Sequence, residues 1–99
     1  MKIIALCGST KFKKEFEQIN RELTLAGHIV LSVGVFCHSG DTVTDAQKVL
    51  LDIIHKKKID LADEIFVINK NGYIGQSTRS EINYAIAAGK KVRYLEELA

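Results

Sequence analysis

Short apolar runs alternate with helical patterns along this chain of 99 residues, and that alternation limits its possible folds more than any other feature. Each apolar run has a length typical of one buried strand. The runs lie at 2–7, 29–36, 65–68 and 92–95. The segments between them carry apolar side chains at helical spacing. They lie at 11–26, 45–62 and 80–89. Strands connected through helices pair in parallel and are covered on both faces, so the sequence predicts an α/β fold.

The small number of strands favours a doubly wound, flavodoxin-like parallel sheet of four to five strands in the order 2-1-3-4(-5), with helices on both faces. The order reverses between strands one and three, and ligands bind outside the carboxyl ends of these strands. The loops at this switch point are residues 8–11 and 69–80. Both are rich in Gly, Ser or Thr and lead into helices, so they offer backbone N–H groups and hydroxyls. We therefore expect a site for a small polar ligand, such as a phosphate or a sugar.

Composition excludes several other classes of protein. A chain of 99 residues suits one domain, and we assign residues 1–99 to it. The 14 basic and 12 acidic side chains nearly cancel, which argues against a nucleic-acid polymer or a membrane as partner. No apolar run approaches the roughly 20 residues that cross a bilayer, and no leader pattern opens the chain. Cys7 and Cys37 are too few and too far apart for a disulfide framework or zinc cluster. We expect a cytoplasmic protein without metal or other cofactor.

Glu81 follows the second glycine-containing loop, about one turn inside the helix that this loop enters. Two interpretations fit this position. The carboxylate can project toward a ligand held above the sheet, on the same side as the loop at residues 8–11. Alternatively, Thr78 is the N-cap of the helix and Glu81 is the N3 acid of a capping box.

Several segments, taken together and in order, resemble the nucleoside 2-deoxyribosyltransferase superfamily, which includes deoxynucleoside 5′-monophosphate N-glycosidases. The first strand ends in Cys-Gly-Ser at 7–9, and residues 61–68 read Leu-Ala-Asp-Glu-Ile-Phe-Val-Ile. They are followed by Glu-Ile-Asn-Tyr-Ala at 81–85 and Gly-Lys-Lys-Val at 89–92. The similarity covers nearly the whole chain, and it implies a flavodoxin-like domain that acts on nucleosides or nucleotides.

The resemblance also implies roles for individual residues. Glu81 matches the nucleophile that attacks the anomeric carbon and expels the base, leaving a glycosyl-enzyme for water or a second base. Ser9 and Lys11 match the residues that hold a 5′-phosphate, although a helix cap and a solvated lysine explain them equally simply. The implied substrate contacts extend to other residues of the two loops. These are Cys7, Gly8, Tyr73, Gly75, Ser77 and Thr78.

The chain departs from the family pattern beside the expected nucleophile. Residues 3–6 of the first strand include no tyrosine to orient it. His55 occupies a position where the family usually has an acidic residue, and we include it among the substrate contacts. Asp60 or Asp52 can supply the missing carboxylate, or both can be surface acids of an amphipathic helix.

Three aromatic residues have two interpretations each. Tyr73 can stack on a base or anchor its loop, and Tyr84 can reach the site or pack in the core. His38 can act as an acid or base, or lie exposed in its loop.

The sequence predicts an enzyme that cleaves or transfers an N-glycosidic bond, or else a non-catalytic nucleotide-binding module of the same fold. In either case we expect a homodimer, because a short chain leaves its crevice shallow and the resembled family completes its sites between subunits.

Overall fold

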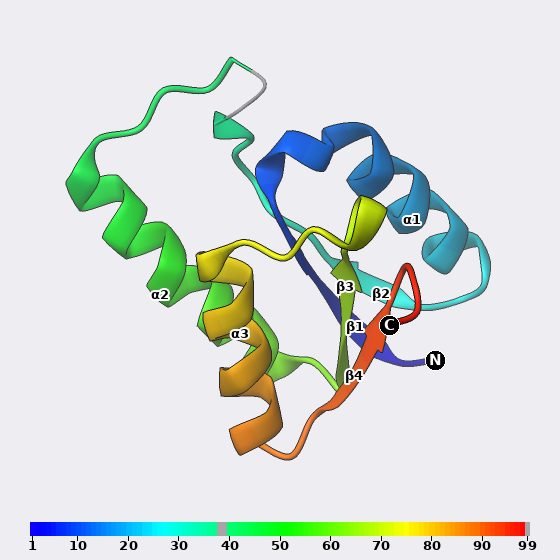
Figure 1. Cartoon of the computed structure of the whole chain (residues 1–99). Helices are drawn as coiled ribbons and strands as arrows, with labels where there is room; N and C mark the ends of the chain where they lie inside the picture. The colour runs from blue at the N-terminus through cyan, green and yellow to red at the C-terminus, as the bar shows by residue number, and fades with distance from the viewer. Residues whose placement is uncertain (38–39, 99) are drawn as a thin grey trace.

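The computed structural model describes residues 1–37 and 40–98 and contains a four-stranded, all-parallel sheet in the order β2-β1-β3-β4 (Figure 1). The strands are β1 (Ile3–Gly8), β2 (Ile29–Leu31), β3 (Glu64–Ile68) and β4 (Lys91–Tyr94). The helices are α1 (Lys13–Leu25), α2 (Asp45–Leu61) and α3 (Gln76–Ala87), with short 3-10 turns η1 (Thr10–Phe12) and η3 (Lys70–Gly72) after β1 and β3. The predicted α/β, flavodoxin-like fold and its strand order are confirmed.

The two faces of the sheet are covered by different helices (Figure 1). Side chains of a parallel strand point alternately to opposite faces. In β1, Ile4 and Leu6 pack with Phe16 of α1. Ala5 and Cys7 point the other way, into a core that α2 and α3 complete. The central strand is thus buried on both sides, as its continuous apolar run predicts.

Local capping explains where α2 begins. The Gln47 N–H donates to Thr44 Oγ1 at 3.1 Å, and the Thr44 N–H donates to Gln47 Oε1 at 2.9 Å. This capping box identifies Thr44 as the N-cap of α2. Helix α3 begins at Gln76, four residues before the predicted start at residue 80, with Gly75 as its N-cap.

Strand β2 is much shorter than the predicted run at 29–36. Only Ile29–Leu31 pair with β1, and β2 lies at the edge of the sheet. At the next residue the carbonyl of Ser32 accepts a hydrogen bond from Lys58 Nζ at 2.7 Å. The chain leaves the sheet here, and the apolar residues beyond it line a cavity instead of extending the strand.

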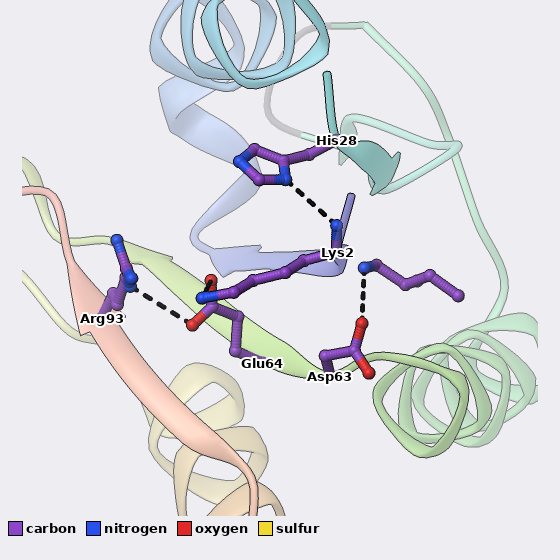
Figure 2. A network of polar contacts seen from close by, with 6 residues as sticks. Lys2, His28, Asp63, Glu64 and Arg93 are labelled. Atoms are coloured by element: carbon purple, nitrogen blue, oxygen red, sulfur yellow. Dashed lines mark hydrogen bonds and ion pairs between the residues drawn. The ribbon is translucent and has the colours of Figure 1, made fainter. Parts of the chain in front are cut away.

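A polar network joins the amino ends of the strands, at the edge opposite that cavity (Figure 2). Glu64 is 2% exposed and pairs with Arg93 Nε at 3.2 Å and Lys2 Nζ at 3.7 Å. The Lys2 N–H donates to His28 Nδ1, and the Ile3 N–H donates to the Asp63 carboxylate. Two cations compensate the buried carboxylate, so the network fixes this edge without leaving a charge unpaired.

Gly8 ends β1 and lies opposite Ile68, the last residue of β3. Its φ is +156°, and a Cβ there would lie 2.8 Å from the Ile68 carbonyl oxygen. We therefore expect Gly8→Ala to lower the free energy of unfolding by roughly 1–3 kcal/mol, because a backbone atom must shift. Urea denaturation measures this change. Gly34→Ala is the matched control, since nothing lies within 4 Å of a Cβ built there. Equal losses in the two variants would contradict the steric explanation.

Candidate functional site

A cavity of about 390 Å³ lies at the carboxyl edge of the sheet, between the loops after β1 and β3 and the side of α2. Its volume is within the range of small-molecule sites. The cavity is at the switch point between β1 and β3, where the predicted topology expects a ligand. It is lined by nine of the candidate site residues from the sequence. These are Gly8, Ser9, Asp52, His55, Tyr73, Gly75, Ser77, Thr78 and Glu81.

Glu81 lies on α3, and its position in this helix excludes the capping-box interpretation. The helix begins at Gln76, so Glu81 is its sixth residue and Thr78 is inside its first turn. The N-cap is Gly75, and Thr78 is buried. A residue one and a half turns into a helix cannot bond the N-cap backbone. Its side chain lines the cavity instead.

Cys7, His55 and Glu81 form one cluster at the inner end of the cavity. Cys7 Sγ lies 3.5 Å from His55 Nε2, and the Cys7 thiol hydrogen-bonds the Glu81 carboxylate. One ligand-type atom from each residue lies within 4.8 Å of the other two. Cys7 is fully buried beneath the cavity, whereas the other two residues line it. Their distances along the chain gave no sign of this cluster, because β1, α2 and α3 bring them together only in the folded sheet.

Burial sets the protonation of this cluster. It raises the pKa of Glu81 to about 7, with the charge of Asp52 acting in the same direction and the Cys7 hydrogen bond and Lys56 opposing. Burial also lowers the pKa of His55 to about 4, helped by Lys58 and opposed by a hydrogen bond to the Leu6 backbone. The pKa of the Cys7 thiol is well above its usual range, through burial and the nearby Glu81. Near neutral pH the cluster therefore holds a neutral imidazole, a thiol and a half-ionised carboxyl group.

Groups suited to an anion also line the cavity. Lys48 and Lys58 line it, as does Ser77 in the first turn of α3. The N-cap Gly75 provides no side chain to bond the first N–H groups of that helix. Free N–H groups and the positive end of a helix dipole attract phosphate or carboxylate. The wall thus combines cations with backbone donors.

Lys11 and Ser9 are partly committed to local contacts. The Lys11 ammonium lies 3.4 Å from the centroid of the Tyr73 ring, a cation–π contact, and Lys11 does not line the cavity. Ser9 Oγ accepts the Lys11 N–H at 3.3 Å, so it caps the turn after β1 as the simpler interpretation expects. Its hydroxyl hydrogen remains available to a ligand, because the cap uses only the oxygen.

Asp60, by contrast, is not part of the cavity wall. Its carboxylate accepts the Tyr84 hydroxyl at 2.7 Å. Helix α2 runs from the cavity toward the opposite edge of the sheet, and Asp60 is in its last turn. Asp52, two turns earlier, does line the cavity and pairs with Lys56 at 3.1 Å. Of the two acids considered, Asp52 is the one beside Glu81.

The structure places two of the three aromatic candidates, Tyr73 and Tyr84. Tyr73 is 46% exposed, and its ring contacts Phe12 edge-on at 6.0 Å between centroids. Tyr84 packs against the core on the α2 and α3 side and does not line the cavity. His38 is outside the described residues. Of these two tyrosines, Tyr73 is the one that lines the cavity.

Neither a protein-family model nor a curated protein matches the chain. Within the described ranges, no helix has the length and apolar character needed to cross a membrane.

Proposed function

We propose that this protein cleaves or transfers the N-glycosidic bond of a nucleoside or a nucleoside 5′-monophosphate, with Glu81 as the nucleophile. The observation that supports this most is the placement of the Glu81 carboxyl group on the wall of the switch-point cavity, next to Asp52. A pair of carboxyl groups is the usual equipment for glycosidic chemistry.

In the proposed reaction the ionised Glu81 attacks the anomeric carbon of the sugar while the bond to the base breaks. The base leaves with the bonding electrons and takes up a proton. Water, or a second base, then attacks the same carbon and releases the Glu81 carboxylate. Asp52 is suited to accept the proton of that water. The buried Cys7 thiol holds the Glu81 side chain by a hydrogen bond, in place of the tyrosine that the resembled family uses.

The substrate would lie across the cavity with its polar ends at opposite walls. A 5′-phosphate fits the part of the wall that Ser77 and the α3 N-terminus form, with Ser9 adding a hydroxyl and Lys48 a positive charge. The base would lie beside Tyr73, where stacking contributes about 1–3 kcal/mol in other nucleic-acid binders. This arrangement favours a nucleotide over an uncharged nucleoside.

A nucleotide-binding module without turnover is the second candidate. It is favoured by one observation: within residues 1–37 and 40–98, Cys7 hydrogen-bonds Glu81 and no tyrosine does. The two candidates are separated by incubating the protein with nucleosides and 5′-monophosphates and measuring the free base by chromatography. Base release supports the enzyme, and binding without base release supports the module.

We also propose that the active form is a homodimer joined through α2. Apolar side chains on this helix are 40–68% exposed, an unusual arrangement for a helix that otherwise packs on a sheet. They are Val49, Leu50, Ile53, Ile54 and Leu61. The patch is continuous with the cavity, because Ile54 belongs to both. A second copy that covers this face would also close the open side of the site.

Ile53→Asp should convert the dimer to a monomer, since it places a charge in the middle of the apolar face, where Ile53 is 51% exposed. Light scattering after size-exclusion chromatography measures the mass. Leu25→Asp is the matched control, because Leu25 is 70% exposed on α1, across the sheet. A wild type that is monomeric at tens of micromolar, or a dimer lost equally in both variants, would contradict an α2 interface.

A further inference from the structure

We propose that Cys7, His55 and Glu81 bind a single divalent transition-metal ion of the zinc type at the inner end of the cavity. The cluster offers three different ligand atoms, namely a sulfur, an imidazole nitrogen and a carboxylate oxygen. Zinc binds this set of donors, and three protein ligands with one open position are typical of sites that also admit a small molecule.

The distances in the cluster fit a tetrahedral ion. With metal bonds of about 2.3 Å to sulfur and about 2.05 Å to nitrogen, tetrahedral geometry separates these two atoms by about 3.6 Å. Cys7 Sγ and His55 Nε2 are 3.5 Å apart. A Glu81 oxygen lies within 4.8 Å of both, so rotation of its side chain can bring it to the ion as the third ligand.

The charges of the ligands and a hydrogen bond that orients His55 also favour a metal ion in this cluster. A thiolate and a carboxylate together neutralise a divalent cation, which matters where burial penalises any net charge. The His55 ring hydrogen-bonds the Leu6 backbone. An outer contact of that type orients the imidazoles that bind metals.

The binding step is balanced by proton release. The ion replaces the thiol proton of Cys7 and any proton on Glu81, and these protons pass to solvent through the cavity. The fourth metal position then faces the cavity, where water or a ligand can occupy it. Affinity should therefore rise with pH.

The metal would compete with the proposed reaction, a consequence that rests on the proposed function. A Glu81 carboxylate that is bound to zinc cannot attack a sugar, so zinc should inhibit base release. The binding itself is independent of any activity and can be tested without a substrate.

Cobalt(II) is the probe for this site, because its spectrum reports both thiolate ligation and tetrahedral geometry. Titration of the full chain with Co²⁺ should produce a near-ultraviolet thiolate-to-cobalt band and intense visible bands that saturate at one ion per chain. Added Zn²⁺ should abolish these bands. Cys7→Ser should remove the thiolate band, and His55→Gln should lower the affinity at least about 100-fold, more than the loss of an outer contact.

Two matched controls keep the result clear. Cys37→Ser should leave the spectrum unchanged, because that thiol is exposed and outside the cluster. His28→Gln should do the same for a histidine at the opposite edge of the sheet. Circular dichroism checks that each variant is folded. Absence of a thiolate band, or a band that Cys37→Ser removes and Cys7→Ser retains, would overturn the proposal, whether or not base release is observed.

Discussion

Glu81→Gln should abolish base release from every substrate that the wild type cleaves, with a loss of at least about a thousandfold, as expected when a covalent nucleophile is removed. The amide has nearly the size of the carboxyl group and can still accept a hydrogen bond from Cys7. It cannot form the glycosyl ester. Single-turnover assays with chromatography of the released base measure the loss in the chemical step.

Binding should survive this substitution, which distinguishes a nucleophile from a residue that only shapes the pocket. The phosphate contacts assigned to the α3 N-terminus, Ser9 and Lys48 do not involve Glu81. We expect the variant to bind a 5′-monophosphate within a few-fold of the wild-type affinity, measured by calorimetry. Wild-type turnover in Glu81→Gln would refute the mechanism, and so would a loss of activity that simply follows a loss of binding.

The order of the elements and the position of the cavity could be predicted because they depend on patterns that tertiary structure does not change. The buried strand at β1 and the Gly, Ser and Thr-containing loops are visible in the sequence, and the rules for parallel sheets place the site between them. The predicted strand at 29–36 failed because apolar residues beyond Leu31 line a cavity wall. Periodicity does not separate these two environments.

The start of α3 and the cluster around Glu81 could not be predicted for different reasons. Polar residues at 76–79 read as a loop, although the segment is helical and buries Thr78. Element boundaries of this kind are set by tertiary contacts more than by propensity. The Cys7–His55–Glu81 cluster depends on how far α2 and α3 project over the sheet. A sequence identifies its members one at a time, and only the fold shows that they meet.

Base release from an uncharged nucleoside should depend on a single ionisation near neutral pH, whereas a 5′-monophosphate itself titrates at about pH 6. Because the pKa of Glu81 is raised to about 7, the ionised nucleophile decreases below that pH, and kcat/KM should fall about tenfold for each further pH unit. The other two members of the cluster do not titrate in this range. The pKa of His55 is about 4, and that of Cys7 is well above its usual range. The profile should be recorded with a chelator present, so that no metal ion occupies Glu81.

Neighbouring charges on α2 provide a matched pair of tests. The charge of Asp52 raises the pKa of Glu81 and that of Lys56 lowers it, and the two side chains pair with each other at 3.1 Å. Asp52→Asn should therefore move the midpoint of the profile to lower pH, and Lys56→Met should move it to higher pH. Midpoints that do not move, or that move the same way, would show that another group controls the reaction.

The stability of the folded chain should depend on pH in the opposite direction to the activity and fall as pH rises. This dependence tests the same ionisation without a substrate. The pKa of Glu81 is higher in the folded chain, about 7, than its ordinary value of 4.5, so the folded state holds this proton more tightly than the unfolded state does. The contribution of Glu81 to stability therefore falls as pH rises from about 4.5 to about 7, and the penalty is complete above that window. Glu81→Gln removes the penalty, because an amide stays neutral. Its melting temperature should exceed that of the wild type at about pH 8, and the difference should vanish toward pH 4.5. Equal melting temperatures at both pH values would mean that Glu81 ionises freely in the folded protein, and the steep activity profile would then need another origin.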